Sequence, residues 1–265
     1  MKKLRMFSII LLVVSATAYF GFQVYSKVTR DNTPPVVTCD SEELRVSVSQ
    51  PEEDLLKGVK AVDDRSGDVK DTLVIEEISD FTEEGTRIIT YAAVDESKNV
   101  GRMERTLVYE DYQAPVFDMS NGLCFTAGSN VDILGRISAE SVIDGDLTSK
   151  IKYSLEKSIN ASEPGNYPVQ FRVMDSAGKT VYLNTVVEIC DREYAGIDVY
   201  LSDYLIYLEK GQEFSPWEYY QGTDREADLA VDSKVDTTKE GTYYVDYIAS
   251  AGTLKGKNRL VVVVE

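Results

Sequence analysis

The chain repeats itself at a spacing of 80 residues, and this repeat limits the possible folds more than any other feature. Aspartates open three stretches, at Asp31, Asp111 and Asp191. The first two begin DNTPPVV and DYQAPVF, so Pro35 and Pro115 are also 80 residues apart, whereas the third begins DREYAGIDV and lacks the proline. A recurring block of this length indicates one structural unit used several times, so the 265 residues predict three similar units in a row.

A second shared block indicates that the unit is built from β-strands. After Gly85, Gly165 and Gly241, apolar or small residues occupy alternate positions. Aligned on the glycine, these positions are Ile89, Tyr91 and Ala93, then Tyr167, Val169, Phe171 and Val173, and then Tyr243, Val245, Tyr247 and Ala249. A period of two places them on the buried face of a strand. The glycine suits the turn before the strand, because it adopts positive φ without strain.

Short strands of this kind, separated by turn residues, predict an all-β fold of three tandem Ig-like β-sandwich repeats after one N-terminal transmembrane helix. We expect a stub and membrane segment at 1–30, repeats at 31–110 and 111–190, and a divergent repeat at 191–265. Tyr167 and Tyr243 stand where a tyrosine corner would bond nearby backbone, and Arg87 holds that place in the first repeat.

The blocks resemble the tandem bacterial Ig-like domains found on Gram-positive surface proteins and in pesticidal crystal proteins. The first repeat carries DNTPPVV, GVKAVDDRSGDV and EGTRIITYAAVDESKN, and the second carries APVF, IDGDL and PGNYPVQFRVMDSAGK. The third carries VDTTKEGTYYVDYIASAG, with Ala251 where Asp95 and Asp175 stand in the others. The resemblance covers nearly all of residues 31–265. It implies an extracellular sandwich used for spacing, adhesion or partner binding, without catalysis.

The N-terminus predicts a membrane segment. Residues 6–25 contain no charge, and about 20 helical residues cross a hydrocarbon core of ~30 Å. The preceding MKKLR favours a cytoplasmic N-terminus, which would place the C-terminal region outside the cell in a single-pass protein. The alternative is a signal peptide cleaved near Ala18, because Ala16-Thr17-Ala18 fits a cleavage site, and the protein would then be secreted.

Composition narrows the function classes. The chain has no histidine, which removes Ser-His-Asp and Cys-His nucleophilic sites and histidine-ligated metals, so we expect no enzyme and no catalytic residue. Five of the 28 basic residues lie in residues 1–30, so the remaining 23 are outnumbered by 45 acidic residues beyond that point. A surface this negative repels nucleic acid, which we exclude as a partner.

Five aspartates are candidate calcium ligands, because calcium binds hard oxygen donors that could meet near a repeat junction. They are Asp63, Asp64, Asp68, Asp95 and Asp111. The competing interpretation is that aspartates in such turns cap their own backbone. Calcium is the one cofactor that the sequence raises, and we otherwise expect none.

Two further features are candidate contacts. Trp217, Tyr219 and Tyr220 follow Pro216 in a loop-like stretch and either bind a partner or close a core. Cys124 and Cys190 fall in the first and last strands of one repeat and either form a disulfide or remain thiols.

These observations predict a membrane-anchored cell-surface protein. Its first repeats form a stalk, and its distal repeat serves adhesion or binds a protein or glycan partner outside the cell. The alternative function is a structural or accessory subunit of a cell-envelope assembly.

Overall fold

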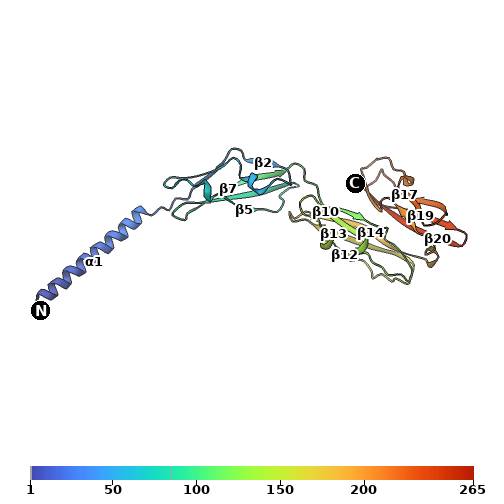
Figure 1. Cartoon of the computed structure of the whole chain (residues 1–265), viewed down its shortest axis with the longest axis horizontal. Coiled ribbons are helices and arrows are strands. Elements are labelled where there is room, and N and C mark those ends of the chain that lie inside the picture. The colour runs from blue at the N-terminus through green and yellow to red at the C-terminus, as the bar shows by residue number, and fades with distance from the viewer. Residues whose placement is uncertain (1, 84) are drawn as a thin grey trace. The chain divides into compact units, whose positions relative to one another are not determined.

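The computed structural model describes residues 2–83 and 85–265, without the side chains of residues 2–4, 28 and 29. It confirms an all-β fold of Ig-like sandwiches that follow one apolar N-terminal helix in the sequence (Figure 1). The chain divides into two compact units, unit 1 (Met1–Glu110) and unit 2 (Asp111–Glu265).

Helix α1 (Lys2–Thr29) is the one helix in the described chain that is long and apolar enough to cross a membrane. The segment Arg5–Lys27 has a mean hydropathy of 1.9, and none of its most apolar window is buried inside the protein. Its large side chains, including Phe7, Leu12 and Phe20, are exposed because no other element covers them. An apolar surface of this extent needs either lipid or removal with a signal peptide.

The sandwich of unit 1 contains two sheets, ordered β1-β3-β4 and β2-β7-β6-β5. The strands are β1 (Val36–Cys39), β2 (Glu43–Val46), β3 (Val59–Asp63), β4 (Gly67–Asp68), β5 (Val74–Ile78), β6 (Thr86–Val94) and β7 (Val100–Tyr109), with short 3-10 helices at Glu52–Leu56 and Lys70–Thr72. Ile89, Tyr91 and Ala93 of β6 are fully buried, as the alternating pattern predicts. The Tyr91 hydroxyl donates a hydrogen bond of 2.7 Å to the Leu55 carbonyl, which satisfies its polar group inside the core.

Gly101 on β7 permits a close approach between the sandwich and the segment that enters it. A Cβ atom at this position would lie 1.8 Å from the Pro35 carbonyl oxygen, so any side chain must displace backbone. We expect Gly101→Ala to lower the free energy of unfolding of unit 1 by about 1–3 kcal/mol, the usual cost of overpacking. Hydrogen exchange of the β6 and β7 amides in the full chain measures this loss. Glu104→Ala, an exposed change on the same strand, is the control, and equal exchange in both variants would contradict the expectation.

Unit 2 contains two sandwiches. The first has sheets ordered β11-β10-β8 and β12-β13-β14-β9, and the second has sheets ordered β15-β17 and β16-β20-β19-β18. The strands are β8 (Val116–Met119), β9 (Cys124–Thr126), β10 (Ile137–Ser141), β11 (Gly145–Asp146), β12 (Lys152–Leu155), β13 (Gly165–Met174), β14 (Thr180–Cys190), β15 (Val199–Leu201), β16 (Leu205–Leu208), β17 (Tyr220–Thr223), β18 (Asp228–Ser233), β19 (Gly241–Ala251) and β20 (Leu254–Val264). Short 3-10 helices lie at Leu134–Arg136, Thr148–Lys150, Arg192–Tyr194 and Pro216–Tyr219.

The two sandwiches of unit 2 share one continuous hydrophobic core. Buried residues from Phe117 in β8 to Val264 in β20 belong to a single cluster. The Tyr207 hydroxyl in β16 donates to the Phe117 carbonyl at 3.3 Å, which ties the second sandwich to the first strand of the other. Burial raises the pKa of Tyr207, so the hydroxyl stays protonated and remains a donor.

The expected tyrosine corners are confirmed. The Tyr167 hydroxyl donates to the Asn160 and Glu163 carbonyls at 3.3 and 3.2 Å, and the Tyr243 hydroxyl donates to the Lys239 carbonyl at 3.0 Å. In unit 1, Arg87 replaces the tyrosine and donates to the carbonyls of two residues in the preceding strand and turn. The turn before this strand is therefore held by a side chain in all three sandwiches, by tyrosine in two of them and by arginine in the third.

Candidate functional site

Three aspartates of unit 1 form a buried cluster. Asp31 precedes β1, Asp63 ends β3 and Asp95 follows β6. One carboxylate oxygen from each lies within 4.8 Å of one from each of the others. Their exposed fractions are 5%, 3% and 3%, so three carboxylates share a space that water hardly reaches.

Two of the three carboxylates each accept a hydrogen bond from a nearby backbone N–H through their Oδ1 atom. The Thr33 N–H donates to Asp31 Oδ1 at 2.9 Å, and the Asn99 N–H donates to Asp95 Oδ1 at 2.7 Å. The Asn99 side-chain amide donates to Asp95 Oδ2 at 2.6 Å and also to the Asp31 carbonyl at 3.3 Å. Asn99 therefore holds the segment around Asp31 against the turn after β6.

Asp63 caps the turn between β3 and β4. Its Oδ1 accepts the N–H of Ser66 at 2.6 Å and the N–H of Arg65 at 3.0 Å. The Ser66 hydrogen bond is the main reason that the pKa of Asp63 lies below its ordinary value. Asp63 is therefore ionised at neutral pH.

The second oxygens of two of these side chains have no partner. Asp31 Oδ2 and Asp63 Oδ2 are buried and accept no hydrogen bond. No ion pair among residues 2–83 and 85–265 involves Asp31, Asp63 or Asp95. Buried carboxylates without a compensating charge or donor are costly, which makes this cluster a candidate cation site.

The structure brings together only part of the predicted calcium set. Asp63 and Asp95 lie in the cluster, whereas Asp64 and Asp68 are exposed beside it in sequence. Asp68 Oδ1 caps the Lys70 N–H at 2.9 Å, and Asp111 belongs to unit 2. Asp31 was missing from the prediction, although the repeated aspartate that opens the first stretch was the signal that could have identified it.

The predicted aromatic group separates into an exposed and a packed part. Trp217 lies on the 3-10 turn Pro216–Tyr219 and is 59% exposed. Tyr219 and Tyr220 are half-buried and pack against the core of unit 2, and burial raises the pKa of Tyr219. Of these three side chains, Trp217 is therefore the one that offers a large aromatic surface to solvent.

The turn beneath Trp217 is held firmly. The Tyr219 ring stacks on Phe214 with 5.9 Å between ring centroids. The hydroxyl of the buried Tyr247 donates a hydrogen bond to the Pro216 carbonyl. The exposed indole is thus carried by a turn that is fixed to the core on its inner side.

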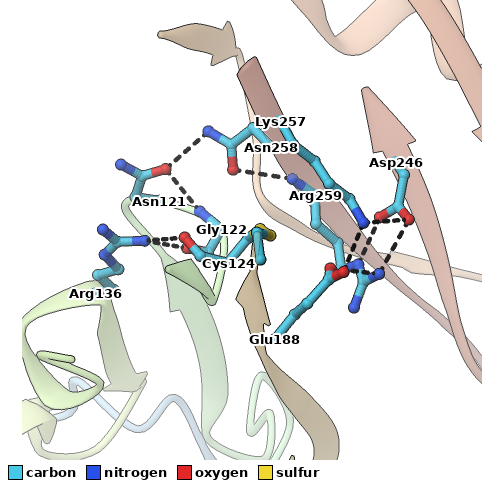
Figure 2. The surroundings of a disulfide bond; sticks show 10 residues. Asn121, Gly122, Cys124, Arg136, Glu188, Asp246, Lys257, Asn258 and Arg259 are labelled. Atoms are coloured by element: carbon cyan, nitrogen blue, oxygen red, sulfur yellow. Dashed lines mark hydrogen bonds and ion pairs between the residues drawn. A yellow bond between two sulfur atoms is a disulfide. The ribbon is translucent and has the colours of Figure 1, made fainter. Parts of the chain in front are cut away.

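Cys124 and Cys190 form a disulfide in the structure, with their Cα atoms 6.5 Å apart. It links β9 to the end of β14, which pair in parallel with Glu188 opposite Cys124. Next to it, the Asn258 side chain of β20 donates to Asn121 Oδ1 at 3.0 Å, so the disulfide lies where the two sandwiches of unit 2 meet (Figure 2).

A network of four charged side chains lies beside this disulfide (Figure 2). Lys257 Nζ lies 2.7 Å from Glu188 and 2.9 Å from Asp246, and Arg259 contacts the same two carboxylates at 2.6 Å each. All four side chains are less than 20% exposed. The Arg259 contact to Glu188 Oε2 is an ion pair without hydrogen-bond geometry, because that oxygen has no hydrogen-bond partner.

The charges in the network control the ionisation of Asp246. Burial alone would raise its pKa, but hydrogen bonds and charges from Arg259 and Lys257 outweigh burial and leave the pKa below its ordinary value. Glu188 comes from the first sandwich of unit 2, and the other three residues come from the second. The network therefore joins the two sandwiches by charge. It could not be predicted from a local pattern, because its members lie on three strands.

Comparisons with known proteins show limited similarity. No protein-family model matches the chain. An uncharacterised 81.3 kDa protein of Acholeplasma phage L2 is 34% identical over 109 residues, which is 40% of this chain. The chain spans 15% of the length of that relative.

Several solved structures align with the chain at low TM-scores. A lipoprotein from Bacteroides thetaiotaomicron has a TM-score of 0.25 at 10% identity, with 56% of this chain and 98% of that chain covered. Human CDH23 EC21-23 has a TM-score of 0.25 at 10% identity, covering 87% of this chain and 100% of that chain. The CBM51-2 and INT domains of Clostridium perfringens ZmpB, solved with GlcNAc, have a TM-score of 0.24 at 13% identity, with 87% of this chain and 42% of that chain covered. TM-scores this low do not indicate a shared function. The Ig-like assignment follows from the strand order of the two sheets in each sandwich.

Proposed function

We propose that the chain is a non-catalytic cell-surface protein that α1 holds in the membrane and whose unit 2 presents Trp217 to a protein partner. The observation that carries the proposal is the exposed indole on a turn that Tyr219 and Tyr247 fix to the core. A tryptophan side chain has only two rotatable bonds, so on a fixed turn it loses little conformational entropy on binding, and tryptophan is frequent among the residues that dominate interfaces.

The anchoring part rests on α1. An apolar segment of 23 residues, Arg5–Lys27, is long enough to span a bilayer, and the basic residues before it favour a cytoplasmic N-terminus. A cleaved signal peptide would share these features, and mass spectrometry of the N-terminus distinguishes the two. An intact N-terminus in the membrane fraction supports the anchor, and a soluble product that begins near residue 19 contradicts it.

Charge and position favour a particular partner. The chain carries a net charge of −17, so an anionic surface would be repelled, and a protein with a neutral or basic face around an apolar pocket is favoured. Glu218, next to Trp217, adds a negative charge at the contact itself.

Site-specific photo-crosslinking tests the proposal. A photoreactive phenylalanine analogue replaces Trp217 in the full chain, and irradiation takes place in the native membrane. We expect one discrete protein adduct. We expect soluble wild-type unit 2 to compete with the formation of this adduct. Trp217→Ala protein should compete at least 10-fold less well, a loss of about 1.4 kcal/mol or more at a dominant contact residue.

The matched control places the same photoreactive group at Tyr200, which is 46% exposed in the same sandwich. Equal adducts at both positions, or adducts with glycan only, would contradict the protein-binding role of Trp217. A stable membrane complex that co-purifies equally well with the wild type and with Trp217→Ala would favour an accessory subunit. Removal of residues 191–265 is unsuitable as a test, because it would expose the core around Phe117.

A further inference from the structure

We propose that Asp31, Asp63 and Asp95 form a calcium site that fastens the first residues after α1 to the sandwich of unit 1. Asp31 follows the end of α1 at Thr29 by two residues, whereas Asp63 ends β3 of one sheet and Asp95 follows β6 of the other. A shared cation would therefore join three separate segments. The site is independent of the contact proposed at Trp217.

The geometry fits one cation. Calcium binds oxygens at about 2.3–2.6 Å, so two oxygens on the same ion lie no more than about 5 Å apart. The three carboxylate oxygens meet this limit, since all lie within 4.8 Å of one another. A set made only of carboxylates favours a hard cation, and calcium tolerates irregular oxygen geometry more readily than magnesium, which requires a near-ideal octahedron.

The two unpartnered oxygens are the observation that separates this cluster from ordinary turn caps. Asp31 and Asp63 each use one oxygen for backbone capping and bury the other without a donor. Carboxylates this close to one another repel each other whenever they are ionised together. A divalent cation would satisfy both oxygens and neutralise most of the charge.

The second repeat shows what the turn itself requires. Ser141 ends β10 as Asp63 ends β3, and each pairs with the glycine of the following short strand. The Ser141 hydroxyl accepts the N–H groups of Ile143 and Asp144 at 3.2 and 3.4 Å, which are the caps that Asp63 Oδ1 provides in unit 1. A serine is thus sufficient for the turn, and the additional carboxylate oxygen of Asp63 serves no capping role.

The position equivalent to Asp95 in the second repeat has a partner for each of its two carboxylate oxygens. Asp175 caps the Lys179 N–H at 2.8 Å, as Asp95 caps Asn99. Its other oxygen accepts a hydrogen bond of 2.9 Å from the Tyr112 hydroxyl. The second repeat therefore compensates its buried carboxylate with a donor, and the first repeat leaves two oxygens for an ion.

Calorimetric titration of the full chain in detergent, after removal of metals with a chelator, tests the site with calcium chloride alone and with magnesium chloride alone. We expect one saturable calcium ion per chain and at least 10-fold weaker binding of magnesium. Asp63→Ser copies the second repeat, keeps the turn caps and should weaken calcium binding at least 10-fold. Asp64→Asn removes an adjacent exposed charge and should leave the affinity unchanged.

Thermal unfolding provides a second measurement that does not depend on heats of binding. Saturating calcium should raise the Tm of the unit 1 transition in the wild-type chain by about 5–10 °C and leave Asp63→Ser unchanged. Absence of saturable calcium binding, unchanged affinity in Asp63→Ser, or tighter binding of magnesium than of calcium would each overturn the proposal.

Discussion

Replacement of Arg259 by methionine is expected to lower the free energy of unfolding of unit 2 by about 3–5 kcal/mol, the usual cost of breaking a buried ion pair. Methionine keeps much of the side-chain volume but leaves Glu188 and Asp246 to share Lys257 alone. It also removes the contact between the guanidinium and the Tyr244 ring, whose centroid lies 5.0 Å away. Urea denaturation of the full chain, followed by the fluorescence of its one tryptophan in unit 2, measures the loss.

The control for this variant is Lys210→Met, because Lys210 pairs with Glu240 at the surface, where both side chains are more than half exposed. That change should cost less than about 1 kcal/mol. If the two variants were equally stable, the network would not hold the sandwiches together.

The same network gives the acid stability of unit 2 a direction. The pKa of Asp246 in the folded chain lies below its ordinary value. The contribution of Asp246 to the free energy of unfolding is therefore complete above the unfolded pKa, and it is lost as the pH falls through the folded pKa. Stability measured between about pH 5 and pH 2 should fall less steeply in Arg259→Met than in the wild type, because that variant has already lost the main partner of Asp246.

Removal of the disulfide is expected to produce the second large effect. The bond closes a loop with a sequence separation of 66 residues, and its loss should lower the free energy of unfolding of unit 2 by about 2–4 kcal/mol. The variant Cys124→Ser with Cys190→Ser, compared with wild type in thermal unfolding, measures the effect. Dithiothreitol should lower the Tm of the wild type and leave the variant unchanged.

Cys39→Ser is the matched control for cysteine replacement. Cys39 is the free cysteine of the described chain and donates to the Ser41 carbonyl at 2.9 Å, which a serine hydroxyl can also do. We expect a change of less than about 0.5 kcal/mol. A wild-type Tm that does not respond to reductant would contradict a stabilising disulfide.

Local patterns predicted the strands and corners because these depend on neighbours in sequence. Alternation after Gly165 identified the buried face of β13, and the position of Tyr167 identified its hydrogen bonds to the preceding turn. Contacts between distant strands left no such pattern. The cluster of Asp31 with Asp63 and Asp95 depends on how three segments meet, so the sequence supplied two of its members together with three other aspartates that lie elsewhere.

The continuous hydrophobic core of unit 2 could not be predicted from the sequence either. The 80-residue repeat favours three equivalent units, yet Tyr207 bonds to Phe117 and the charges on β20 pair with Glu188. A repeat in sequence describes how each sandwich folds and does not determine whether neighbouring sandwiches merge.

The pairing of the strands also determines how the protein would resist a pulling force. In every sandwich an early strand runs parallel to the last one, as β2 with β7, β9 with β14 and β16 with β20. Tension applied through the two ends of a sandwich would slide these strands along each other, so their hydrogen bonds would have to break together rather than one after another. In the middle sandwich the sulfur bridge joins the same two strands, and extension there would stop at a covalent bond. A sandwich with such a bridge would lengthen less under load than one held by hydrogen bonds alone.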